Sequence, residues 1–325
     1  MSIEAVRKIG ELAGVTLVDT AWAQWSSLTS MLVRAGQEPA WTIVDPEALV
    51  LASFAVGHRE RRLEDVVGSW ATGAAYLMSM QRMRTLASQF PKAVAGRIGE
   101  FARAAVAGGD KRWKRLAYPQ AAGGYRPRLK SLEPLRLTDG PALTLRLRAG
   151  FGVNAKADLL SLLLGRSGVA ADLKLIAAAT AYTERAIRTA TEEMVQAGFI
   201  HEIEGRPSSF FADGKAWASV LEAHRPTRPE RTASAVPPWR FWAAGYAFLS
   251  GVLEWAESAQ AEGWTPYVAS SRARDLVEKH GRNLRRAQLD PRFLVSGHGT
   301  RHLAEFEELI LQVREWTSEG LNGLQ

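Results

Sequence analysis

The chain has 325 residues, of which 46% are hydrophobic and 23% charged. This balance is typical of a globular protein with two or three domains. The absence of cysteine excludes disulfide scaffolds, thiol chemistry and cysteine-based zinc sites. No apolar stretch approaches the roughly 18 residues of a membrane span. The N-terminal segment carries charges throughout and lacks a signal-peptide pattern, so we expect a cytoplasmic protein without membrane contact.

The net charge of +7 is unevenly distributed along the chain. Residues 1–135 hold 18 Lys and Arg against 12 Asp and Glu, whereas residues 136–223 hold 10 of each. Residues 224–325 hold 13 basic and 12 acidic side chains. An excess of positive charge favours polyanionic partners, and here that excess lies almost wholly in the first part of the chain.

Two loop-like stretches divide the chain. One runs from Tyr118 to Arg128 with two prolines and a Gly-Gly pair, and the other runs from His224 to Pro238 with four prolines. Such compositions are typical of linkers. We therefore expect a helical domain over residues 1–117, a basic linker over 118–140, a second domain over 141–223, a Pro-rich linker over 224–238 and a helical domain over 239–325.

The first part has a helical pattern throughout. Asp45 precedes Pro46 and an apolar run, which is typical of a capped helix start. Apolar residues at helical spacing then predict one face of a helix, continuing until Pro91; they are Leu63, Val66, Val67, Trp70, Tyr76, Met80, Met83 and Leu86. A last helix is expected near residues 94–106, ending at Gly108 and Gly109.

The middle part begins with three predicted helices. Asn154 is the expected N-cap of a helix over residues 155–164, and a second helix is expected from about Val169 to Ala179. Thr183 is the expected N-cap of a third helix, which ends at Gly198. Small residues between the second and third helices allow the two to pack at a steep angle.

A β-hairpin is expected after the third helix. Residues 199–203 and 209–212 are short apolar strands on either side of a turn that contains Gly205 and Pro207. Arg206 stands at the tip of this hairpin.

The third helix has two contrasting faces. Ile187, Ala190, Met194 and Val195 recur at the spacing of a buried stripe. The opposite face and the start of the helix carry polar side chains, which are Thr183, Glu184, Arg185, Arg188, Thr189 and Glu192.

Helix, helix, helix and hairpin within about 60 residues resemble the winged helix-turn-helix superfamily, particularly the MarR-like and ArsR-like regulators. The resemblance rests on ADLLSLLL at 157–164, on TERAIRTATEEMVQAGFI at 183–200 and on the following hairpin, and it covers under a fifth of the chain. It implies a mainly α-helical protein with a central winged helix over residues 141–223. Its implied function is sequence-specific binding of double-stranded DNA by a transcriptional regulator, acting as a homodimer.

In such a regulator the polar face of the third helix enters the major groove. Arg185 and Arg188 are then expected to contact guanine or phosphate, Thr189 a methyl group or phosphate, and Arg206 the minor groove or backbone. Thr183, Glu184 and Glu192 complete the expected DNA-binding face. The neutral charge of residues 136–223 leaves a second interpretation open, in which the winged helix docks a protein partner without binding DNA.

A basic stretch precedes this module. Residues 111–130 contain seven basic and no acidic side chains, beginning with Lys111, Arg112, Lys114 and Arg115. It is interpreted either as an arm along the DNA backbone, which would supply the charge that the module lacks, or as a solvated loop.

In the last part of the chain, the spacing of apolar residues predicts three helices, over about 241–263, 268–289 and 302–321. The first of them carries an aromatic stripe suited to a core or a subunit interface. This part is therefore the expected dimerisation or effector domain.

His298 and His302 have the spacing of metal ligands, but the absence of a third patterned ligand favours a structural role. No nucleophile elbow, P-loop or dinucleotide motif occurs, so we expect no enzyme activity and no cofactor.

Overall fold

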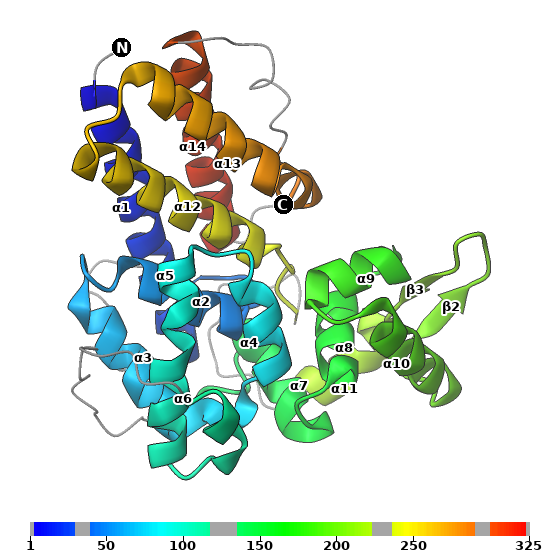
Figure 1. The fold of residues 1–325 in the computed structure, drawn as a ribbon. Coiled ribbons are helices and arrows are strands. Elements are labelled where there is room, and N and C mark those ends of the chain that lie inside the picture. Colours follow the sequence, from blue (N-terminus) through cyan, green and yellow to red (C-terminus); the bar gives the residue numbers. More distant parts are fainter. Residues whose placement is uncertain (1–2, 30–39, 118–134, 223–235, 290–299, 323–325) are drawn as a thin grey trace.

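The computed structural model describes residues 3–29, 40–117, 135–222, 236–289 and 300–322. The protein is mainly α-helical, with one small antiparallel sheet. Helices from the two ends of the chain form one body, and the middle of the chain lies at its side (Figure 1). Among the described helices, none combines the length and the apolar character needed to cross a membrane.

The N-terminal part is helical, as the sequence predicts. Its elements are α1 (Ile3–Leu28), α2 (Pro46–Val56), α3 (Arg61–Ala74), η2 (Ala75–Leu77), α4 (Met80–Ala87), α5 (Lys92–Gly96), α6 (Ile98–Ala107) and η3 (Lys111–Arg115). Asp45 caps α2 by accepting a hydrogen bond from the Ala48 amide, which confirms the predicted helix start. Gly108 follows the last residue of α6, and its backbone lies against Thr72 so closely that a Cβ would not fit.

Two details of this part were predicted wrongly. The periodicity through Tyr76 and Met80 indicated one continuing helix, whereas α3 ends at Ala74 and α4 begins only after Ser79. Ser79 caps α4 by accepting from the Arg82 amide, and this local competitor ends the continuous helix. Tyr76 is consequently 55% exposed. The helix expected over 94–106 is split into α5 and α6 at Arg97.

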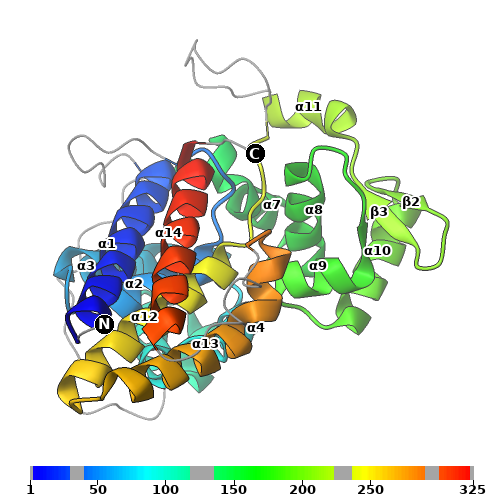
Figure 2. The same cartoon turned by 90° about the horizontal axis from the view of Figure 1, so that it is seen from above.

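The C-terminal part consists of α12 (Trp242–Ala261), α13 (Pro266–Arg286) and α14 (Thr300–Asn322), close to the predicted ranges. Helix α1 lies along α12 and α14 (Figures 1 and 2). The aromatic stripe of α12 is buried, with Tyr246 and Phe248 fully enclosed. Residues from both chain ends therefore share a single hydrophobic core.

The middle part contains the sheet and a second core. Its elements are η4 (Gly140–Ala142), α7 (Leu143–Phe151), α8 (Ala155–Gly165), β1 (Ala171–Asp172), α9 (Leu173–Thr180), α10 (Glu184–Gln196), β2 (His201–Ile203), β3 (Ser209–Phe211) and α11 (Gly214–Glu222). The strands pair antiparallel in the order β1-β3-β2. Apolar side chains of α8, α9 and α10 pack with Phe210 of β3 into this second core. We call residues 140–222 the sheet module.

The start of α9, the second of the three helices predicted from the sequence, was predicted wrongly. The sequence indicated a helix from about Val169, but Ala171 and Asp172 form β1, which pairs with Phe210 and Ser209. Asp172 then caps α9 by accepting from the Leu175 amide. The pairing of β1 with β3 joins residues nearly 40 positions apart, so no local pattern reveals it.

Candidate nucleic-acid interface

Helix α10 presents one polar and one buried face, as predicted. Thr183 caps the helix by accepting from the Ala186 amide, and Gly198 ends it with a positive φ of 71°. Ile187, Ala190 and Met194 are at most 4% exposed. The predicted polar side chains on this helix are all exposed, namely Thr183, Glu184, Arg185, Arg188, Thr189 and Glu192. The helix phase inferred from the sequence is thus confirmed.

A groove of about 460 Å³ runs between the start of α8 and the polar face of α10. Its lining includes Asn154, Lys156, Arg185, Thr189 and Glu193. Asn154 caps α8 by accepting from the amides of residues 156 and 157. The start of α8 and residues along α10, from its N-cap Thr183 to Glu193, therefore line one groove, and each helix start has a partial positive charge.

A single ion pair spans this groove. The Lys156 ammonium lies 2.6 Å from the Glu193 carboxylate, and both side chains are at least 40% exposed. Such exposed pairs contribute little to stability. The Lys156 ammonium is therefore available to an anion that enters the groove, at little cost in folding free energy.

Arg206 lies in the loop that joins β2 to β3 and is exposed. In both views, the β2–β3 hairpin and α10 form the side of the sheet module farthest from the helices of the first core (Figures 1 and 2). The predicted wing residue and the predicted reading helix therefore lie on one projecting side of the molecule.

The basic stretch is placed elsewhere. Lys111, Arg112, Lys114 and Arg115 belong to η3, which packs on α6 rather than extending as an arm. The Trp113 indole is buried against the Phe101 ring, and Arg112 pairs with Asp110. Helix α6 lies at the lower end of the helical body, away from α10 (Figure 1). Residues 118–130 of the predicted arm lie outside the described residues.

The predicted histidine pair cannot be assembled from the described residues. His302 is fully buried in α14, and His298 lies outside the described range. Within the described part of the chain, no group of three or more His, Asp or Glu side chains is arranged to hold a metal ion.

A buried ionic network, which the sequence analysis missed, lies where the sheet module meets the N-terminal helices. It consists of Asp45, Glu47, Arg82, Arg148 and Asp158, each at most 7% exposed. Arg148 donates to both Glu47, at 2.6 Å, and Asp158, at 2.7 Å. Arg82 contacts Glu47 at 2.6 Å and Asp45 at 2.7 Å. Three carboxylates thus face two guanidinium groups.

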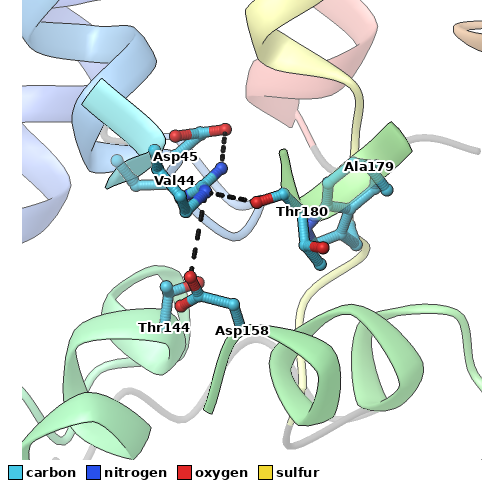
Figure 3. A pocket seen from close by; sticks show the side chains of 8 residues that line it. Val44, Asp45, Thr144, Asp158, Ala179 and Thr180 are labelled. Atoms are coloured by element: carbon cyan, nitrogen blue, oxygen red, sulfur yellow. Dashed lines mark hydrogen bonds and ion pairs between the residues drawn. The ribbon is translucent and has the colours of Figure 1, made fainter. Parts of the chain in front are cut away.

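Because carboxylates outnumber guanidinium groups in this network, the pKa values of its carboxyl groups shift in different directions. Burial raises the pKa of Asp45 above its ordinary value, although the Arg82 guanidinium opposes the shift. Burial also acts to raise the pKa of Glu47, but the Arg148 and Arg82 guanidinium groups outweigh it and lower that pKa. Asp45, Thr144, Asp158 and Thr180 surround a cavity of about 10 Å³ (Figure 3), which is roughly the space required for one water molecule.

The sequence contained a signal for this network. Asp158 directly precedes the apolar run of α8, and Arg148 directly follows the alternating leucines of α7. A charged residue on the buried face of a helix is almost always paired. Their partners on α2 and α4 lie 76 or more positions away, so the sequence pattern alone does not identify them.

Comparison with known proteins gives no further guide to this interface. The chain matches no known family profile, and neither the curated proteins nor the solved structures contain a significant match to it.

Proposed function

We propose that the protein binds double-stranded DNA through the polar face of α10. The observation that carries this proposal is the phase of α10, which buries Ile187 and leaves Arg185 and Arg188 exposed. Arg185 also lines the groove. Paired arginines on one helix face suit bidentate contacts with guanine or phosphate. Transcriptional regulation as a homodimer is the corresponding biological role, because one reading helix contacts only a few base pairs.

The order of elements supports this proposal. Helix, strand, two helices and a β-hairpin, with the sheet order β1-β3-β2, are the parts that a winged helix-turn-helix requires. Within this interpretation α9 and α10 form the helix-turn-helix, and the loop around Arg206 is the wing. The groove between α8 and α10 then receives a phosphate group beside Lys156.

A protein-docking role is the second candidate. Several apolar side chains of the sheet module are exposed, namely Phe199 at 39%, Ile203 at 48% and Val220 at 59%. The Phe199 ring also contacts the rings of Phe151 and Trp217, which lie on α7 and α11. Exposed apolar side chains near one another are a feature of protein interfaces, and the neutral charge of residues 136–223 accords with this role.

Two double variants, each of which removes two positive charges, separate these candidates. We expect Arg185→Ala/Arg188→Ala to weaken binding to a mixed-sequence DNA duplex by at least about tenfold, because each lost charge-assisted contact is worth roughly 1.5–3 kcal/mol. Lys111→Ala/Lys114→Ala should leave the affinity unchanged, because η3 packs on α6, away from α10. The measurement is fluorescence anisotropy of a labelled duplex at several salt concentrations.

Equal losses in both variants would mean that net charge alone attracts DNA. An unmodified protein that binds no duplex even at low salt would remove the DNA proposal and favour protein docking.

A further inference from the structure

The turn between α9 and α10 is held by a side chain from outside the sheet module. Arg82 of α4 donates through Nε to the carbonyl oxygen of Thr180, the last residue of α9, at 2.7 Å. Ala181 then adopts a left-handed conformation with φ of 56°. Only Tyr182 separates it from Thr183, the N-cap of α10.

Tyr182 provides a second link at the same place. Its hydroxyl lies 3.3 Å from the Ser79 hydroxyl, and Ser79 is the residue that caps α4. Burial raises the pKa of the Tyr182 phenol. The phenol therefore remains neutral and able to donate a hydrogen bond. The start of α10 is thus joined to α4 at two adjacent points.

The ionic network extends this link to the rest of the sheet module. Arg148 of α7 reaches Glu47 of α2, while Arg82 approaches Asp158 of α8 at 3.8 Å. Each arginine therefore contacts carboxylates from both sides of the junction (Figure 3 shows Asp45 and Asp158 on its two sides). A buried charge without a partner is strongly unfavourable. A rotated sheet module would break these pairs, so only one orientation satisfies all of them.

We propose that Arg82 is a positioning residue that fixes the direction of α10 relative to the helical body. Arg82 is 3% exposed and cannot touch DNA itself. The effect on DNA binding rests on the function proposed above, whereas the effect on orientation does not. If the sheet module samples several orientations, only the competent fraction binds, and the apparent dissociation constant rises in inverse proportion to that fraction.

The absence of cysteine allows a direct measurement of this orientation. Spin labels are attached to a full-length Lys92→Cys/Gln196→Cys variant, which places one label on α5 and the other at the end of α10. Both positions are exposed. Pulsed electron paramagnetic resonance spectroscopy then gives the distribution of distances between the two labels.

We expect Arg82→Met to broaden this distribution and to weaken binding of a DNA duplex by about tenfold, which corresponds to a competent fraction of about one tenth. Arg97→Met is the matched control. Arg97 pairs with Glu64 and Glu100 and lies over the Phe54 ring, so its contacts remain inside the N-terminal part. It should lower the unfolding temperature without broadening the distribution.

A second variant covers the case in which Arg82→Met does not fold. Arg82→Lys keeps the charge but offers one ammonium in place of three separate nitrogen donors, and it should broaden the distribution to a smaller extent. A folded Arg82 variant with an unchanged distribution would overturn the inference. A broadened distribution in a protein that binds no duplex would uphold the inference and remove the DNA proposal.

Discussion

Two neighbouring carboxylates show how far a single residue's surroundings determine its role. Asp45 and Glu47 both contact Arg82. Glu47 also contacts Arg148 and accepts from the Ser79 amide, and its pKa is lowered, whereas burial raises the pKa of Asp45. The ionised form of Glu47 is therefore stabilised by the fold, while the ionised form of Asp45 is disfavoured.

Removing each charge should consequently have unequal effects on the free energy of unfolding. We expect Glu47→Gln to lower it by about 3–5 kcal/mol, because two buried guanidinium groups lose a partner. Asp45→Asn should lower it by less than about 1 kcal/mol, because an asparagine caps a helix as well as an aspartate does. Urea denaturation of both variants at neutral pH measures the two values.

The pH dependence follows from the same pKa directions. A raised pKa in the folded state means that Asp45 contributes most below its ordinary pKa of 3.8 and that this contribution is lost as the pH rises through the folded value. The stability of the unmodified protein relative to Asp45→Asn should therefore fall as the pH increases above 3.8. Equal losses in the two variants, or a relative stability that rises with pH, would contradict this account of the network.

At the scale of elements, local patterns predicted what local chemistry determines. The caps Asn154 and Thr183 and the buried stripe of α10 follow from the sequence, because each depends on residues within a turn or two. Strand β1 and the docked η3 do not, because β1 needs β3 as a partner and Trp113 needs the Phe101 ring of α6. The sequence predicted the part of the candidate site that lies on α10. It did not predict the contacts of α4 with the turn that precedes α10.

The close approach of α1 and α12 gives a prediction at this scale. A Cβ at Gly10 would lie 2.3 Å from the Ala256 Cβ, so Gly10→Ala forces the two helices apart. We expect it to lower the free energy of unfolding by about 1–3 kcal/mol. Gly96→Ala on α5 is the control, because a Cβ at Gly96 would meet no atom within 4 Å. Replacing glycine by alanine within an open helix is neutral or stabilising by up to about 1 kcal/mol.

Thermal unfolding followed by circular dichroism compares the two glycine variants. An equal or greater loss in Gly96→Ala would show that the contact between α1 and α12 is not the tight packing described here.

At the scale of the whole molecule, the chain ends build one body and the middle of the chain projects from it. Helices α1, α12 and α14 share the first core, while α10 and the β2–β3 hairpin lie on the far side of the sheet module (Figures 1 and 2). Most of the excess positive charge belongs to residues 1–135, which precede the sheet module. The proposed interface therefore depends more on the positions of a few side chains, such as Arg185 and Arg188, than on net charge.

The most direct test of this account is a position-resolved DNA selection on two single variants. Arg188→Ala and Arg206→Ala each remove one positive charge from an exposed residue, the first on α10 and the second in the hairpin loop. We expect Arg188→Ala to cost roughly 1–3 kcal/mol at one base position and to relax the preference there. Arg206→Ala should weaken binding evenly across sequences. Uniform losses in both variants, or no loss in either, would contradict the claim that α10 reads DNA.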